Sequence, residues 1–83
     1  MNSEEIKSTV LRLLGDIAPE ADLTQLNPDR NIRDQLDIDS MDFLNFVIAL
    51  DKELHIAVPE TDYQKIATIH DCVAYLAQKG GQQ

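Results

Sequence analysis

The sequence predicts an all-α domain, a small bundle of three main helices plus one short helix, with a long loop between helices one and two. Apolar residues recur at helical spacing in three segments, and no alternating run is long enough to indicate a sheet. A chain of 83 residues also has room for only one small core. We therefore expect residues 1–83 to form a single domain with a frayed tail at Gly80–Gln83.

The first helix is expected to begin at Ser3, a residue type that caps helices. Glu4 and Glu5 follow in the first turn, where negative charge meets the positive end of the helix dipole. Gly15 and Pro19 mark the region where the helix ends. One face of this helix should pack inward, because it carries the apolar residues Ile6, Val10, Leu13, Leu14 and Ile17.

The segment from about Asp16 to Asp39 is predicted to be a long loop, since prolines and asparagines are scattered among charges and the apolar residues are isolated. A connection of this length is unusual in a compact domain and is usually functional or held by buried side chains. The candidate anchors are Leu26, Ile32 and Leu36.

The second helix is expected to run from Met41 to Leu54, with Asp39 or Ser40 as its cap and Val58-Pro59 as its stop. The segment contains no glycine or proline. At 100° per residue, one side forms an apolar stripe wide enough to join the core: Phe43, Phe46, Val47, Leu50 and Leu54.

A second apolar flank of the same helix consists of Met41, Leu44 and Ile48. A surface helix does not need two apolar strips to fold. The loop or the short third helix could cover this flank, or it could be a docking surface for a partner protein. Docking gains support from the neighbouring acids Asp39, Asp42 and Asp51, because apolar area with charge at its rim is typical of transient interfaces.

The last part of the chain predicts one short and one longer helix. Thr61 and Asp62 can open a brief helical turn that continues through Tyr63 and Ile66. Thr68 is the expected cap of the closing helix, which should end near Gly80-Gly81. Its inward face is expected to hold Ile69, Cys72, Val73 and Leu76.

Charge and size exclude several classes of function. The net charge of −8 repels nucleic acids and anionic membranes and attracts basic patches on proteins. No stretch approaches the ~20 apolar residues that span a bilayer, so we expect no membrane insertion. So small a core also offers little room for a deep active site, so we expect a protein that is not an enzyme. We also expect a monomer.

The lone cysteine and the N-terminal segment both favour a cytoplasmic setting. Cys72 cannot form an internal disulfide, and its place on an apolar helical face predicts a core residue. The first residues carry no basic region followed by an apolar run, so they do not resemble a targeting signal.

No metal site is predicted. Three aspartates near the end of the loop suggest calcium, but Met41 and Phe43 break the alternation of oxygen ligands that a calcium loop requires. His55 and His70 are too isolated to form a metal pair or an acid–base unit, so exposed or capping roles are expected for both.

Ser40 is the candidate functional residue. It stands between Asp39 and Met41-Asp42 at the entrance of the second helix, where free backbone N–H groups and the helix dipole favour a phosphate ester. Position alone does not decide its role, because a plain N-cap serine is common at such a place.

The run from Asp37 to Asp42, followed by the helix through Leu54 and then Val58-Pro59, resembles the Asp-Ser-Leu region of acyl carrier proteins. The resemblance covers nearly the whole chain, since the order and length of the predicted helices and the closing Tyr75-Leu76 are also similar to that family.

The resemblance implies that Ser40 carries a 4′-phosphopantetheine arm, transferred from coenzyme A by a phosphopantetheinyl transferase of the holo-carrier synthase type. The thiol of the arm would hold acyl groups as thioesters. The expected partners are then acyl-loading, condensing and acyl-transfer enzymes with basic docking patches. It also implies an acyl pocket between the helices, with the candidate lining Phe46, Leu50, Leu54, Val58 and Ile66.

Several positions depart from the family pattern. Asp37 stands where many members have glycine, and Phe43, Asn45 and Lys52 make the second helix bulkier and less acidic than usual. These differences imply a specialised carrier with a dedicated pathway, within fatty-acid, polyketide or related acyl metabolism. A peptidyl or aminoacyl carrier and an acidic helical adaptor without a prosthetic group are the alternatives; Asp37-Ile38 disfavours the former, which usually has two glycines there.

Overall fold

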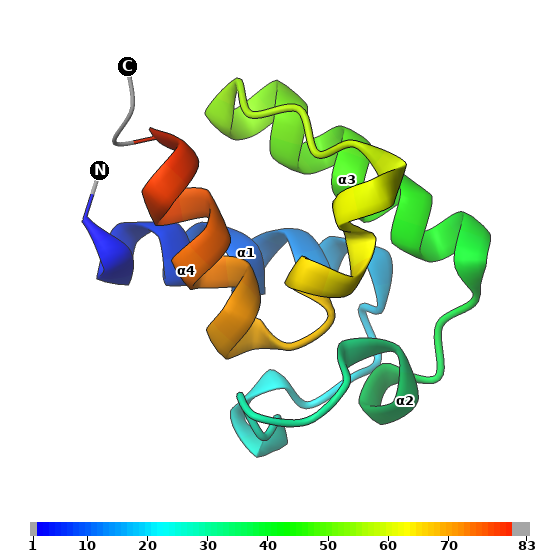
Figure 1. The fold of residues 1–83 in the computed structure, drawn as a ribbon. Coiled ribbons are helices and arrows are strands. Elements are labelled where there is room, and N and C mark those ends of the chain that lie inside the picture. Colours follow the sequence, from blue (N-terminus) through cyan, green and yellow to red (C-terminus); the bar gives the residue numbers. More distant parts are fainter. Residues whose placement is uncertain (1, 81–83) are drawn as a thin grey trace.

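The computed structural model describes residues 2–80, and within them the chain forms four α-helices and two 3-10 helices (Figure 1). These elements are, in chain order, α1 (Ser3–Ile17), η1 (Leu23–Gln25), α2 (Ile32–Leu36), α3 (Ser40–Leu54), η2 (Glu60–Ile66) and α4 (Ile69–Gly80). The only extended pairing in the described residues is an isolated bridge between Asn31 and Thr68. The all-α class is therefore confirmed. Of the predicted tail, Gly81–Gln83 lie outside the described residues, and Gly80 ends α4.

The N-cap of helix α1 is not the predicted residue. Asn2 is the N-cap, and its side chain accepts a hydrogen bond from the backbone N–H of Glu5 at 2.9 Å. Asparagine caps helices at least as well as serine, so Asn2 can take the role predicted for Ser3. Ser3 is then the first helical residue. The predicted inward face is buried at four positions, and Ile17 at the end of α1 is half-buried.

The predicted long loop is shorter and more structured than the sequence indicated. Helix α1 continues to Ile17, and η1 and α2 interrupt the connection before α3 begins. Ile32 is fully buried and confirms its prediction as an anchor, whereas Leu26 and Leu36 are half-buried against the core. Ile38 is a further buried anchor that the sequence did not single out.

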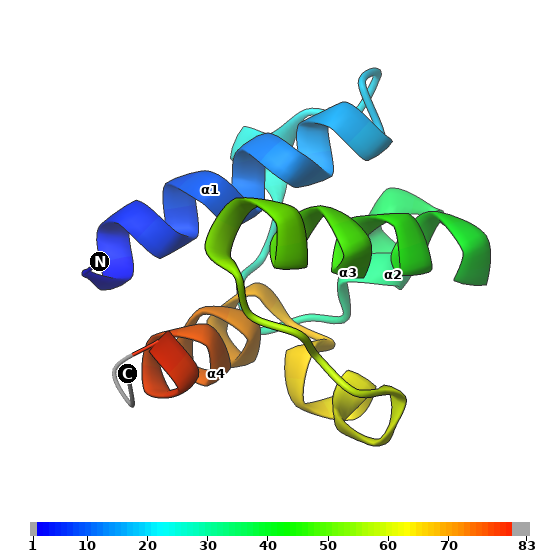
Figure 2. The ribbon, with the colours of Figure 1, turned by 90° about the horizontal axis from the view of Figure 1, so that it is seen from above.

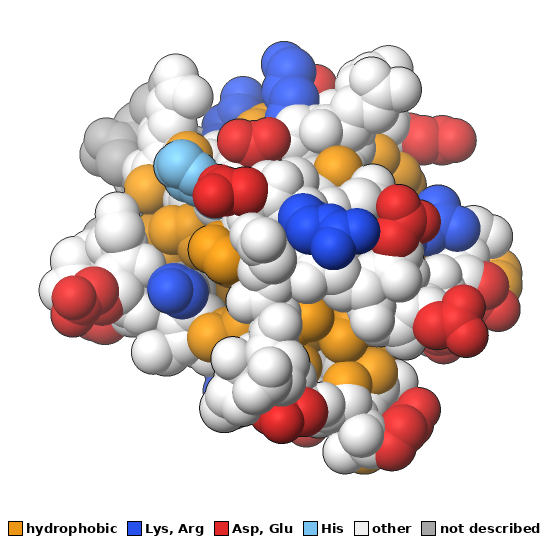
Figure 3. Space-filling model, turned by 90° about the horizontal axis from the view of Figure 1, so that it is seen from below, with side chains coloured by type: hydrophobic (Ala, Val, Ile, Leu, Met, Phe, Trp, Pro, Cys, Tyr) orange, Lys and Arg blue, Asp and Glu red, His pale blue; other side chains and the backbone are white. Residues whose placement is uncertain are grey.

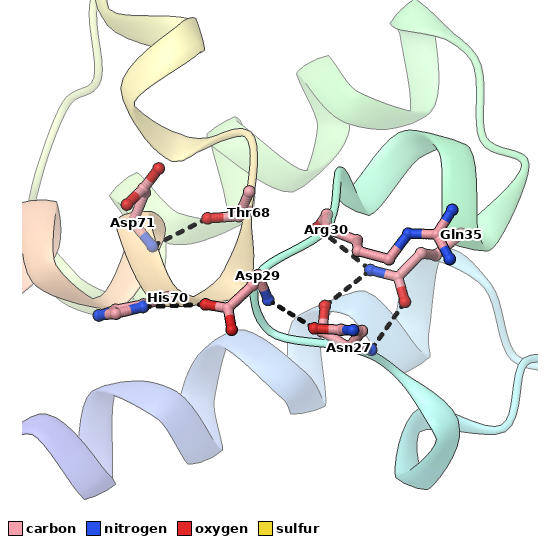
Figure 4. Close-up of polar contacts among 7 residues, drawn as sticks. All are labelled: Asn27, Asp29, Arg30, Gln35, Thr68, His70 and Asp71. Atoms are coloured by element: carbon pink, nitrogen blue, oxygen red, sulfur yellow. Dashed lines mark hydrogen bonds and ion pairs between the residues drawn. The ribbon is translucent and has the colours of Figure 1, made fainter.

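Polar contacts also hold this connection in place (Figure 4). The side-chain amide of Gln35 donates to the carbonyl oxygens of Asn27 and Arg30, while its oxygen accepts from the N–H of Asn27. At the start of α4, His70 Nδ1 lies 3.1 Å from Asp29 Oδ1, and the His70 N–H donates to the carbonyl of Pro28. These contacts tie a segment without long helices to the rest of the bundle.

Three longer helices enclose the core. Helix α1 packs against both α3 and α4, and η2 packs against α4, as the two ribbon views show (Figures 1 and 2). The largest fully buried side chains come from these elements and from α2: Phe46, Leu14, Ile32, Leu50, Ile66, Leu76, Val10 and Cys72. Cys72 is thus a core residue as predicted, and burial raises the pKa of its thiol to about 12.

The C-terminal half follows the prediction closely. Thr68 caps α4, since its hydroxyl oxygen accepts from the N–H of Asp71 at 3.0 Å. The inward face differs at one position: Val73 is half-buried, and Tyr75 is buried in its place. The Tyr75 hydroxyl donates to Asp62 Oδ2 at 2.7 Å and so connects α4 to η2.

The same contact shifts the pKa values of both partners. The hydrogen bond from Tyr75 lowers the pKa of Asp62 below its usual 3.8, and Lys65 nearby adds to this effect. Desolvation, followed by the hydrogen bond and the charge of Asp62, raises the pKa of Tyr75 to about 12. A phenol with one apolar and one polar end suits this position, because its ring fills the core while its hydroxyl keeps a partner.

Candidate functional site at the start of α3

Ser40 is exposed and is the first residue of α3. Asp39 is the N-cap, which decides between the two predicted caps: its Oδ1 accepts from the N–H of Asp42 at 2.9 Å. Asp42 Oδ2 in turn accepts from the N–H of Asp39 at 3.4 Å, so the two carboxylates form a capping box. The capping role that Ser40 could have had is therefore taken by its neighbours.

The backbone before Ser40 makes a sharp corner. Asp37 ends α2 in the left-handed conformation, with φ 53° and ψ 43°, and its N–H donates to the carbonyl of Arg33. The following Ile38 is 8% exposed and fixes the corner to the core. Glycine is favoured at a left-handed helix end, which explains why many family members have glycine at this position. Aspartate is one of the few other residues that adopt this conformation readily.

This geometry fits a phosphate ester on Ser40. The side chain is exposed, and α3 is long enough, at 15 residues, to place the positive end of a helix dipole beside Ser40. The flanking carboxylates of Asp39 and Asp42 accept hydrogen bonds from backbone N–H groups, which fixes both side chains in the cap of α3. A serine held this way can carry a long flexible substituent without disturbing the core.

The second apolar flank of α3 is exposed. Met41 is 62%, Leu44 38% and Ile48 44% exposed, so the alternative in which the loop or the third helix covers this flank is wrong. We call these three residues the apolar strip. Asp39 and Asp51 are exposed beside it, while Asp42 is half-buried by its part in the cap. The strip therefore starts directly beside Ser40 and follows α3 for two turns.

The residues predicted to line an acyl pocket lie together in the core. Phe46, Leu50 and Ile66 are completely buried, Val58 is 6% exposed and Leu54 is half-buried. A hollow of about 190 Å³ opens beside them between α2, α3 and η2, but other residues line it: Asn31, Arg33, Phe43, Tyr63, Gln64 and Ala67. The pocket assignment stays a prediction.

A larger hollow lies away from Ser40. It measures about 540 Å³, and its lining comes from the start of α1, the loop and α4, without any residue of α3: Ser3, Glu4, Lys7, Pro28, Asp29, Ile69, His70, Val73 and Ala74. On the face seen from below in Figure 3, apolar side chains reach the surface between acidic and basic groups. Volume alone therefore does not locate the candidate site of this protein.

Residues 2–80 contain no group of three or more histidine, cysteine, aspartate or glutamate side chains arranged to hold a metal ion. His55 is exposed and ends α3 in the left-handed conformation, and His70 is exposed beside Asp29, so both histidines have the kind of role predicted for them. Over the same residues, none of the helices is long and apolar enough to cross a membrane.

Comparison with known proteins gives the class first. Residues 4–76 match the family model described as a phosphopantetheine attachment site. This match runs from the second residue of α1 into α4, so it covers most of the chain and establishes a phosphopantetheine-carrying domain. The prosthetic group supplies a thiol on a flexible arm, which forms thioesters with acyl groups.

The relatives give the family. An acyl carrier protein from Lactobacillus acidophilus is 31% identical over 81 residues, which are 98% of this chain and 100% of the relative. One from Solidesulfovibrio magneticus is 26% identical over 80 residues, 96% of each chain. A solved structure of the acyl carrier protein from Enterococcus faecalis has a TM-score of 0.79 at 26% identity and covers 95% of this chain and 99% of that one. The chain belongs to the acyl carrier protein family, whose members are carriers and not enzymes.

The structure also shows site features that the sequence prediction missed. Helix α2 places Arg33 beside the corner that leads to Ser40. The sequence prediction missed this helix because five residues are too few to show a helical period of apolar residues. One local signal for α2 is present in the sequence: Asn31 is a residue type that caps helices, and in the structure its side chain accepts a hydrogen bond from the N–H of Asp34. A cap followed by two apolar residues four positions apart would have found this helix.

Proposed function

We propose that Ser40 is the attachment point of the phosphopantetheine arm and that the chain delivers acyl thioesters to partner enzymes. One observation carries this proposal: an exposed serine opens α3 while two neighbouring carboxylates perform the capping. Ser3 also opens a helix, but it lies outside residues 4–76, which match the phosphopantetheine family model. Ser8 lies inside α1, away from any helix terminus that could support a phosphate.

The attachment step is a phosphoryl transfer. The Ser40 oxygen forms a bond to the pantetheine-bearing phosphorus of coenzyme A, and the pyrophosphate P–O bond breaks. The serine proton is lost, and adenosine 3′,5′-bisphosphate leaves. The phosphodiester that results is anionic, so the N–H groups in the first turn of α3 stabilise the product.

The apolar strip and its acidic neighbours are the proposed docking surface. Met41, Leu44 and Ile48 provide a small apolar contact, while Asp39 and Asp51 attract basic patches on an enzyme. Such a contact releases quickly, which a carrier needs because it visits several enzymes in turn. The proposed partners are a phosphopantetheinyl transferase and the acyl-loading, condensing and acyl-transfer enzymes of one pathway.

The pathway we propose is a dedicated one within fatty-acid, polyketide or related acyl metabolism, located in the cytoplasm. The surface of α3 supports this, since Asn45 and Lys52 are exposed beside the strip and make it less acidic. Lys52 repels a basic partner at the far end of the helix. Enzymes served by this carrier should therefore contact mainly the first two turns of α3.

The test is modification by a phosphopantetheinyl transferase with coenzyme A, followed by the intact mass of the protein. The chain should gain the mass of one phosphopantetheine, and Ser8→Ala, which removes an exposed serine of α1, should gain the same. Ser40→Ala should gain nothing. No gain in the unaltered chain, or a gain that persists in Ser40→Ala, would contradict the proposal and favour an adaptor without a prosthetic group.

A further inference from the structure

The 190 Å³ hollow between α2, α3 and η2 has an aromatic floor. The ring of Phe43 meets the ring of Tyr63 edge to face, with centroids 5.7 Å apart and planes at 71°. Phe43 is 5% exposed and also packs on Phe46 at 5.9 Å. These contacts join α3 to η2 at the base of the hollow.

This floor separates the hollow from the buried residues behind it. To pass between α3 and η2 here, a chain must part Phe43 from Tyr63 and open a fully packed interior that includes Phe46, Leu50 and Ile66. Both changes remove favourable contacts before the chain gains any. Cargo that stays in the hollow, above the aromatic floor, disturbs neither.

Four polar side chains that can donate hydrogen bonds also line the hollow. Arg33, Asn31, Tyr63 and Gln64 present a guanidinium, two amides and a phenol around the aromatic floor, and no acidic residue lines this hollow. Arg33 is exposed and forms no ion pair with another residue of the described range 2–80. On a chain with a net charge of −8, this is a local site of opposite sign.

A second hollow connects this site to the corner before Ser40. It measures about 350 Å³, shares Asn31 and Arg33 with the first and extends to Asp37 and Ile38, which precede Ser40 by three and two residues. An arm attached to Ser40 can therefore follow α2 towards Arg33. Asp34 and Asp37 line only the second hollow, so they repel an anion there and favour its place over Phe43 and Tyr63.

We propose that the hollow between α2, α3 and η2 binds the far end of an acyl group that carries a carboxylate, with Arg33 as the binding residue. The planar guanidinium matches a carboxylate in charge and in the spacing of its donors. The cargo class is the short half-thioester of a dicarboxylic acid rather than a long alkyl chain. This inference rests on the proposed attachment of the arm to Ser40.

The test compares a charged cargo with a neutral one on the holo protein. Glutaryl and pentanoyl groups have the same chain length, and only the first ends in a carboxylate. With loading verified by intact mass, the thermal midpoint of the glutaryl form should exceed that of the pentanoyl form by about 2–6 °C at low salt. Arg33→Gln should abolish this difference, and Arg30→Gln, an exposed neighbour that lines neither hollow, should keep it.

Arg33→Lys keeps the positive charge but loses the two parallel donors of the guanidinium, so it should retain part of the difference in thermal midpoint between the two cargoes. This variant keeps the test usable if Arg33→Gln does not fold. Equal midpoints for the two cargoes, or a difference that survives Arg33→Gln, would overturn the inference. A midpoint that rises further with octanoyl than with glutaryl would also overturn it, because an alkyl chain would then enter the core. If no arm is found on Ser40, the proposed function fails as well, so the mass distinguishes the two failures.

Discussion

The two flanks of α3 have similar side chains and opposite roles. Phe43, Phe46, Val47 and Leu50 are buried against α1 and the rest of the core, whereas the apolar strip on the other flank is 38–62% exposed. Burying an aliphatic or aromatic side chain stabilises a fold by roughly 1.5–3 kcal/mol. The residues of the apolar strip, being exposed, contribute less than this to the stability of the protein.

This difference shows that one helix serves folding and recognition on separate surfaces. Changes on the buried flank should alter stability, and changes on the exposed strip should alter partner exchange alone. Ser40 stands at the start of both flanks, where a group attached to its hydroxyl is presented to whatever docks on the strip.

The largest effect on stability is expected on the buried flank. Phe46 is completely buried and contacts Phe43, so Phe46→Ala should lower the free energy of unfolding by about 3–5 kcal/mol. That is a large part of the stability of so small a domain. Urea unfolding followed by circular dichroism measures this loss. A loss below about 1 kcal/mol would show that the core is not packed around this ring.

The exposed strip should give the opposite result. Ile48→Glu should change the free energy of unfolding by no more than about 0.5 kcal/mol, because the side chain is 44% exposed. It should lower the rate of modification by the transferase about tenfold, since it removes apolar contact and adds charge where a partner binds. The matched control is Gln78→Glu, which adds the same charge on the exposed surface of α4. Equal rates for both variants would exclude the strip as the docking surface.

The cap that frees Ser40 should have an intermediate effect. Asp39→Ala removes the acceptor for the N–H of Asp42 and should cost about 1 kcal/mol of stability. Asp39→Asn keeps a capping oxygen but not the charge, so it should restore most of the stability. If modification of Ser40 is slow in both variants, the charge of Asp39 serves docking; if it is slow only in Asp39→Ala, the helix start matters more.

The hydrogen bond between Tyr75 and Asp62, which connects α4 to η2, predicts two effects of pH on the free energy of unfolding. The pKa of Asp62 lies below its usual 3.8, so this contribution to stability is present above that pH and is lost as the pH falls further. The pKa of Tyr75 is raised from 10.0 to about 12, so its contribution is complete below pH 10 and is lost between pH 10 and 12. Urea midpoints of Tyr75→Phe, measured at the same pH values, should lack the alkaline effect and show a smaller acidic one, because Lys65 still lowers the pKa of Asp62.

The smallest effect is expected at the corner before α3. Asp37 has a positive φ of 53°, which costs a non-glycine residue a little strain. Asp37→Gly should raise stability by at most about 1 kcal/mol, with Asp34→Gly inside α2 as a control that lowers it by a similar amount. A destabilised Asp37→Gly would mean that the aspartate side chain itself holds the corner.

The sequence predicts the long helices well because each combines a cap with a sustained apolar period, as Thr68 and the face from Ile69 to Leu76 show. It missed α2, which has one buried residue and relies on contacts made far along the chain, such as the bond from the N–H of Ile32 to the carbonyl of Ala67. Periodicity cannot reveal contacts of that kind.

For the site, the sequence singled out the serine, its acidic neighbours and the apolar strip, since all lie on one helix or at its cap. It left open whether the strip is covered, and the structure shows it exposed. It did not predict Arg33 or the contact of Phe43 with Tyr63, because these depend on how α2 and η2 pack against α3. It also did not place Tyr75 on the inward face of α4, for a related reason: the hydrogen bond to Asp62 lets a tyrosine occupy the interior.

The most direct measurement is the location of the arm after modification by transferase and coenzyme A. The three serines, Ser3, Ser8 and Ser40, fall on three different peptides after cleavage at lysine and arginine, and residues 34–52 contain Ser40 as their only hydroxyl side chain. Mass spectrometry should find one phosphopantetheine on peptide 34–52 and none on the peptides with Ser3 or Ser8. An arm on either of those peptides, or on none, would contradict the assignment of Ser40.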